Sequence, residues 1–223
     1  AANGSKTYDG TALTASGVTV TEGTLFEGDE LVATAEGSAT NVADSTEGNN
    51  PVAAGYKVMH NGTDVTANYV ITPVAGTLTI NPKAVTITAH SKAFAYTGQA
   101  QSWNKYDVEG LVDGDAIAAT VAGSITFPSE SPVANVVESY EFITGTAGNY
   151  SVSTVDGELS MTNASQAITI TAASDSKTYD GTALTASDVT VTSGSLFEGD
   201  ELVATAEGSA TNVADTAAGN NPV

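Results

Sequence analysis

A long internal repeat constrains this chain more than any other feature of its sequence. Residues 5–52 return as residues 176–223 with a constant offset of 171 positions, and the two copies differ at only six positions. A long period with near-identity is typical of a tandem array, in which each copy is one structural unit. The chain is therefore expected to consist of several small units and not of one large core.

A shorter period lies inside the long one. Tyr8, Tyr96 and Tyr179 mark the same point of successive units, at spacings of 88 and 83 residues. The first of these units lacks an opening strand and the third stops before its closing strands, so neighbouring sequence or another chain is expected to supply them. We divide the chain into a first repeat (1–82), a second repeat (83–166) and a third repeat (167–223).

Strands are predicted wherever an apolar residue alternates with threonine. Such alternation of β-branched residues indicates strands with one buried face and suits half-buried antiparallel sheets. The runs are Val18–Thr21, Thr77–Ile80, Val85–Thr88 and Ile168–Thr171. Frequent glycines beside Asp, Asn or Glu supply the turns between them. The predicted fold class is all-β, with tandem small β-sandwich-like or β-grasp-like domains arranged end to end as an elongated rod.

The clearest hairpin is predicted around Asn61-Gly62. Residues 56–60 and 63–66 flank this pair as two short strand-like runs. Asn and Gly tolerate the positive φ angles of a tight turn, so the two runs are expected to pair directly.

Composition limits the partners of the chain. The formal net charge is −20, with 26 acidic and only six basic residues. A surface this acidic repels phosphate groups, so neither nucleic-acid binding nor attachment to anionic lipid is expected. The chain has no cysteine, which excludes disulfides and, in an array of small domains, favours a bacterial surface protein or the cytosol. No apolar run reaches the about 18 residues of a membrane helix, so this segment is not expected to insert into a membrane.

Turn and strand motifs resemble those of a known family. Gly110–Asp115, Asn149-Tyr150 and Gly157-x-Leu159 are similar to the motifs of MBG-type (mucin-binding-like) repeat domains of large bacterial surface proteins and adhesins. The first repeat looks similar at Leu25–Asp29 and Asn68-Tyr69. This resemblance implies a non-catalytic, extracellular repeat module, on the cell surface or in a surface filament.

The sequence offers few candidates for chemistry. His60 and His90 lie in different repeats and are expected at solvent-facing strand ends, and no nucleophile motif is present, so no catalytic residue, resident cofactor or enzyme activity is predicted. Calcium is the alternative, because acidic turns offer hard oxygen ligands. The three turns Glu27–Glu30, Asp113–Asp115 and Glu198–Glu201 lack the spacing of an EF-hand loop, which favours solvated turns over a metal site.

Trp103 and Tyr106 are the candidate glycan contacts. Trp103 is the single tryptophan of the chain and lies between polar residues in Gln101–Tyr106. Aromatic rings in such a setting can stack on a sugar ring, but one tryptophan in a small domain also serves as a packing residue or a contact between repeats. The sequence leaves both interpretations open.

The leading functional hypothesis is mechanical. A structural repeat segment of a secreted bacterial surface protein would act as the stalk or fibre of an adhesin, with neighbouring repeats or copies of itself as partners. In a first alternative, the chain is a subunit of an extracellular filament whose incomplete end domains are completed by strands from neighbouring copies. In a second alternative, the repeats are glycan-binding or mucin-binding modules.

Overall fold

The computed structural model describes residues 1–164 and 166–223. Its regular elements are β-strands and short 3₁₀ turns, which confirms the predicted all-β class. The strands are β1 (Gly4–Thr7), β2 (Asp29–Val32), β3 (Lys57–His60), β4 (Thr63–Asp64), β5 (Leu78–Asn81), β6 (Lys83–Ala89), β7 (Lys92–Ala95), β8 (Tyr106–Glu109), β9 (Ala116–Ala122), β10 (Val133–Thr144), β11 (Tyr150–Val155), β12 (Gly157–Thr162), β13 (Thr169–Ala172) and β14 (Val189–Ser193). The 3₁₀ turns are η1 (Val42–Asp44), η2 (Thr66–Asn68), η3 (Pro128–Glu130), η4 (Ala147–Asn149) and η5 (Val213–Asp215).

The chain forms two compact units. The first compact unit comprises Ala1–His90, Asn104–Ala122 and Val136–Asp156, and the second comprises Ser91–Trp103, Gly123–Asn135 and Gly157–Val223. The predicted second repeat, 83–166, contributes to both, and residue 165 within it lies outside the described residues. The boundaries of the three predicted repeats stay a prediction.

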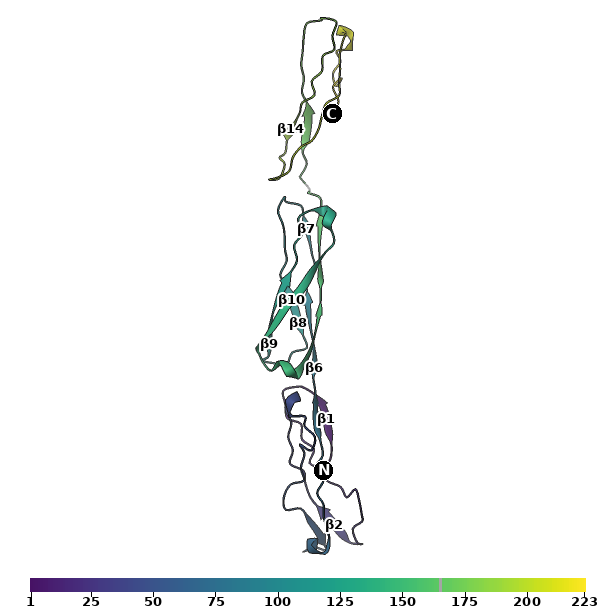
Figure 1. The fold of residues 1–223 in the computed structure, drawn as a ribbon, viewed down its shortest axis with the longest axis vertical. Helices are drawn as coiled ribbons and strands as arrows, with labels where there is room; N and C mark the ends of the chain where they lie inside the picture. Colours follow the sequence, from purple (N-terminus) through teal and green to yellow (C-terminus); the bar gives the residue numbers. More distant parts are fainter. Residues whose placement is uncertain (165) are drawn as a thin grey trace. The chain divides into compact units, whose positions relative to one another are not determined.

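Strand β6 is the middle strand of a three-stranded sheet in the first compact unit. It pairs with β8 in antiparallel orientation, and the two lie side by side in Figure 1. On its other edge it pairs with β11 in parallel orientation. Val85, Ile87 and Ala89 are at most 3% exposed, so the alternation predicted the buried face correctly. The expectation of antiparallel sheets was wrong for this edge. The direction and register of pairing depend on which distant strand pairs with β6, and the local sequence pattern does not specify that strand.

The predicted hairpin is confirmed. Strands β3 and β4 pair in antiparallel orientation with His60 opposite Thr63. Asn61 and Gly62 both have positive φ angles, 46° and 84°, the conformation that favours Asn-Gly in two-residue hairpin turns. Strand β2 pairs with the other edge of β3.

A hydrophobic cluster fills the first compact unit across the predicted boundary at residue 82. Strand β5, which pairs in parallel with β1, contributes Leu78 and Ile80, and β6 continues the same cluster after the proline. Strands β9 and the Val136–Thr144 part of β10 pair in antiparallel orientation and add Ile117 and Val121.

The second compact unit has a smaller cluster. Strand β12 pairs in parallel with β7 and in antiparallel orientation with Val133–Asn135 of β10. Leu159 and Met161 of β12 pack with Ile125. Further along the chain, β13 and β14 form an antiparallel pair.

Equivalent segments of the first and third repeats differ in secondary structure. The prediction of a strand at Val18–Thr21 was wrong, because these residues form no regular strand. Their counterparts Val189–Thr192 belong to β14, which pairs with the opening strand β13. Among the described residues, no strand pairs with Val18–Thr21 in the way that β13 pairs with β14.

Candidate functional site

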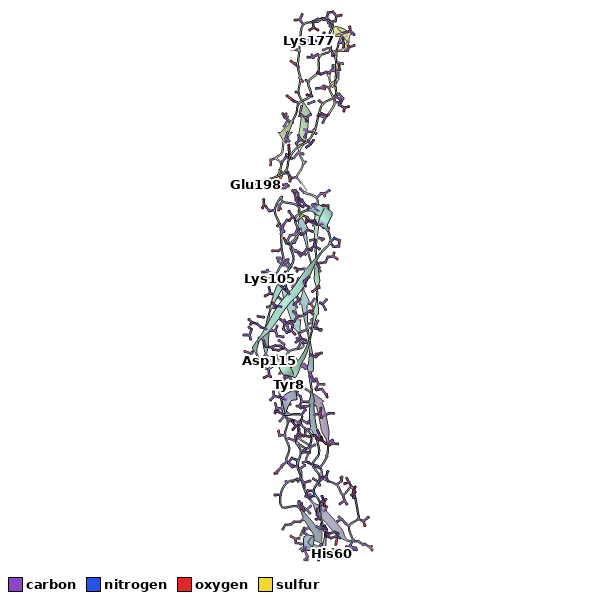
Figure 2. All side chains as sticks on the ribbon, in the orientation of Figure 1. Tyr8, His60, Lys105, Asp115, Lys177 and Glu198 are labelled. Carbon is purple, nitrogen blue, oxygen red and sulfur yellow. The ribbon has the colours of Figure 1, made fainter. Side chains whose placement is uncertain are left out.

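The junction between the first and second repeats lies inside the first compact unit. Tyr8 and Tyr150 pack in an edge-to-face arrangement, with ring centroids 5.4 Å apart and an interplanar angle of 82°. The two rings are 9% and 7% exposed. Phe142 stacks on the Tyr150 ring at 5.4 Å, so the tyrosine of one repeat is packed into the end of the next. Figure 2 labels Tyr8 and Asp115, which mark the two sides of this junction.

A buried asparagine adds hydrogen bonds to the same junction. The Asn149 Oδ1 accepts the Val42 N–H at 2.9 Å, and its Nδ2 donates to the Asn41 Oδ1 at 2.8 Å. Asn149 is 1% exposed. Because a buried amide without partners is costly, these bonds fix η1 of the first repeat against η4 of the second.

The Asn-Tyr and Gly-Asp motifs meet in space. The Tyr150 hydroxyl donates to Asp115 and accepts the Val112 N–H at 3.2 Å. Burial, followed by the hydrogen bond to Asp115, raises the pKa of Tyr150 to about 12. The same arrangement recurs in the first repeat, where the Tyr69 hydroxyl donates to Asp29 and accepts the Phe26 N–H at 3.0 Å.

The junction between the second and third repeats lies inside the second compact unit and uses the equivalent tyrosine. Tyr96 packs edge to face against Phe197 with centroids 5.4 Å apart. Its hydroxyl donates to the Asp200 Oδ1 at 2.6 Å, and this bond raises the pKa of Tyr96. Gly98 has φ 77°, and a Cβ there would lie 2.7 Å from the Phe197 Cβ. Because the glycine of the Tyr-x-Gly element has no side chain, Phe197 of the next repeat can pack closely against it.

The predicted glycan contacts lie in different hydrophobic clusters. Trp103 is half-buried against the cluster of the second compact unit, and the Lys92 Nζ lies 4.9 Å from the centroid of its ring. Tyr106 is half-buried in the first compact unit, where its hydroxyl accepts the Ala119 N–H at 3.0 Å. Both side chains pack against core residues, and their role in glycan binding stays a prediction.

The acidic turns that suggested calcium have side-chain partners. Asp29, Asp115 and Asp200 each accept a hydrogen bond from a tyrosine hydroxyl. The His60 Nδ1 also lies 2.5 Å from the Asp29 Oδ1, and the bonds from Tyr69 and then His60 lower the pKa of Asp29. Within residues 1–164 and 166–223, no three His, Cys, Asp or Glu side chains gather as a metal site would require. Calcium binding remains a prediction.

Sequence reasoning missed most of these junction residues. Tyr8, Tyr96 and Tyr179 served as markers of the period, and Asn149-Tyr150 as part of a motif, without any contact being assigned to them. The sequence did contain an indication of these contacts, because the Tyr-x-Gly, Gly-Asp and Asn-Tyr motifs all recur. Only the structure shows that residues of these motifs contact one another.

These observations define an all-β protein in which two recurring Tyr-x-Gly elements pack against aromatic residues distant in the sequence. The family model of the MBG domain (YGX type) matches residues 85–160, about one third of the chain, and confirms the resemblance noted above. MBG domains are non-catalytic repeat modules found in surface proteins. No curated protein and no solved structure matches the chain significantly. No helix among the described residues has the length and apolar character needed to cross a bilayer.

Proposed function

We propose that this chain is a structural segment of a secreted bacterial surface protein, acting as the stalk or fibre of an adhesin. The observation that carries the proposal is the recurrence of one docking element. Tyr8 and Tyr96 occupy equivalent positions, and each packs into the end of the following repeat. A module that docks its successor in this way can extend by duplication without changing its own core.

The first junction supports a stiff connection. Bending it would expose Tyr8 and separate Asn149 from its partners, and burial of one large side chain alone is worth about 1.5–3 kcal/mol. The chain also crosses the boundary through Pro82, between β5 and β6, where proline restricts φ. Stiff connections would arrange the repeats end to end as an extended rod and hold an adhesive tip away from the cell.

Small-angle X-ray scattering tests the proposal on the whole chain. We expect the scattering of a rod with the cross-section of one domain. Asn149→Ala, which removes the buried junction amide, should broaden the distribution of interatomic distances. Asn68→Ala is the matched control, because Asn68 is the equivalent residue of the first repeat and is exposed. Scattering from a compact globule would contradict the stalk.

The second candidate function is a filament of copies joined by strand addition, in which a strand of a neighbouring copy would lie in a groove of the first repeat. The groove has a volume of about 690 Å³ and lies between residues 18–24 and 69–74. In the second repeat, the corresponding strands β8 and β11 flank β6. Val70 and Val74 are 102% and 64% exposed, so this groove offers an apolar strand a partner on each side.

Sedimentation velocity at increasing concentration distinguishes the filament from the stalk. The filament predicts head-to-tail species that disappear when the residues Ala-Ile-Thr-Ile-Thr are fused before Ala1, because the groove is then filled within one chain. Sedimentation as a monomer at every concentration would contradict the filament hypothesis and would agree with the stalk hypothesis.

Glycan binding is the remaining candidate, supported by the family and by Trp103. Trp103→Ala should abolish binding to mucin or to a glycan array if the indole is the stacking platform. Unchanged binding, or the absence of any binding by the parent chain, would exclude this role.

A further inference from the structure

The two junctions share their docking tyrosine. Tyr8 and Tyr96 each pack edge to face on an aromatic ring of the next repeat, with centroids 5.4 Å from those of Tyr150 and Phe197. Each tyrosine begins a Tyr-x-Gly element. Because this element is common to both junctions, it does not distinguish one following repeat from another. Selectivity between repeats therefore has to come from other residues.

The turns η1 and η3 have the same backbone frame in the first and second repeats. In η1 the Asp44 carboxylate accepts two backbone N–H groups, at 2.9 and 2.7 Å. In η3 the Glu130 carboxylate accepts the two equivalent N–H groups, at 2.8 and 2.9 Å. The residues before the turns, Asn41 and Phe127, both have extended backbone, with φ −107° and −122°. The frame is therefore retained although the sequences of the two turns differ.

The first two residues of this frame differ in the groups that they offer to a neighbour. They are Asn41-Val42 in the first repeat and Phe127-Pro128 in the second. The Val42 N–H and the Asn41 Oδ1 are the two partners of the Asn149 amide, at 2.9 and 2.8 Å. Proline has no N–H and phenylalanine has no side-chain acceptor. A Phe-Pro pair at this junction would therefore leave the amide of Asn149, which is 1% exposed, without both partners, and such burial is costly.

The Phe-Pro pair has a different use in the second repeat. The Phe127 ring lies 6.2 Å, centroid to centroid, from the ring of Tyr96, which in turn packs on Phe197. The second repeat has Val112 at the position of Phe197, two residues before the glycine of the Gly-Asp motif. An aromatic group on the third repeat therefore contacts the aromatic end of the second repeat, and the second repeat has no such group at this position.

We propose that the residue pair at the start of η1 and η3 determines which repeat can dock behind it. The Asn-Val pair selects a repeat that buries an asparagine, as the second repeat buries Asn149. The Phe-Pro pair disfavours such a repeat and selects one with an aromatic residue at the position of Phe197. The second repeat therefore does not dock behind another copy of itself. This rule rests on the docked repeats of the proposed stalk, and it adds a constraint on their order.

A double-mutant cycle on the full chain tests the rule. Asn41→Phe combined with Val42→Pro gives the first repeat the Phe-Pro pair of the second, so this exchanged pair then lies against Asn149. In the parent chain, Asn149→Ala should lower the folding equilibrium constant of the first compact unit about ten- to 100-fold, measured by circular dichroism in urea. In the chain with the exchanged pair, Asn149→Ala should change this constant by less than about twofold, because the amide has already lost its partners.

The third repeat offers a matched control. Asn212 and Val213 occupy the same turn, whose N–H groups bond to Asp215, and both residues are exposed. Asn212→Phe combined with Val213→Pro should leave the midpoint of the urea transition followed by tryptophan fluorescence unchanged. A loss as large as that from the exchange in the first repeat would overturn the rule, since the turn itself would then reject the pair.

Val42→Pro alone replaces the exchanged pair if that chain does not fold, because it removes a single N–H and proline is tolerated at the first position of a helical turn. The effect of Asn149→Ala should then fall about three- to tenfold relative to the parent. Equal effects of Asn149→Ala in all backgrounds would overturn the rule. Equal effects together with rod-like scattering would leave the stalk intact, whereas the expected coupling together with scattering from a compact globule would keep the rule and contradict the stalk.

Discussion

Tyr8 and Tyr179 offer an internal test of the junction, because they are the same residue in two near-identical segments. Tyr8 is 9% exposed and packs on Tyr150, whereas Tyr179 is 61% exposed. Truncation of a buried aromatic to alanine costs about 3–5 kcal/mol, of which the edge-to-face pair accounts for about 0.5–1.5 kcal/mol. We therefore expect Tyr8→Ala to lower the free energy of unfolding of the first compact unit by about 3 kcal/mol. For Tyr179→Ala we expect less than about 1 kcal/mol.

Urea denaturation of the two variants and the parent chain, followed by far-UV circular dichroism, measures this difference. Trp103 is the only tryptophan and belongs to the second compact unit, so its fluorescence reports that unit separately. Tyr8→Ala should lower the urea concentration at the midpoint of the circular dichroism transition. The midpoint of the transition followed by tryptophan fluorescence should not change. Equal destabilisation by the two substitutions would refute the reasoning, since it would show that the tyrosine acts within its own repeat and not across the junction.

Three further predictions follow from the contacts. Gly98→Leu should destabilise the second junction, because even a Cβ at this position lies 2.7 Å from that of Phe197; a lower melting temperature in calorimetry checks this, and an unchanged one contradicts it. Asn50→Ala should cost about 1–3 kcal/mol in urea denaturation, because buried backbone groups lose their partners. Tyr150 has a pKa of about 12 when folded, above its ordinary value of 10.0. The unfolded chain therefore loses this proton first, and stability should fall between about pH 10 and 12. Tyr150→Phe should reduce that fall, and an identical pH profile for the variant would count against the assignment.

Local pattern predicted the individual strands better than their pairing. The alternation at Val85–Thr88 identified the buried face of β6, and Asn61-Gly62 identified the hairpin. Parallel pairing of β6 with β11 was not predictable, because it joins segments about 65 residues apart and no local sequence pattern indicates such a long-range contact. The packing of Tyr8 on Tyr150 escaped prediction for the same reason, although both residues belong to recurring motifs.

The Val-Thr-Val-Thr run shows most directly that local sequence pattern does not determine whether a segment forms a strand. The same four residues occur at 18–21 and at 189–192, yet only the second copy forms a strand. Strand β13 supplies its backbone partners, so propensity alone does not decide the outcome. Tyr8 and Tyr179 make the same point for burial, since the tyrosine is 9% exposed in the copy that packs on Tyr150 and 61% exposed in the other copy.

The stiffness of the first junction tests the account most directly. The chain has no cysteine, so Thr19→Cys and Thr154→Cys place two spin labels at exposed positions of the first and second repeats. Pulsed electron paramagnetic resonance then measures the distribution of distances between the labels. A single narrow peak that broadens on Tyr8→Ala is the predicted result. A broad distribution in the parent chain would contradict a stalk built from docked repeats.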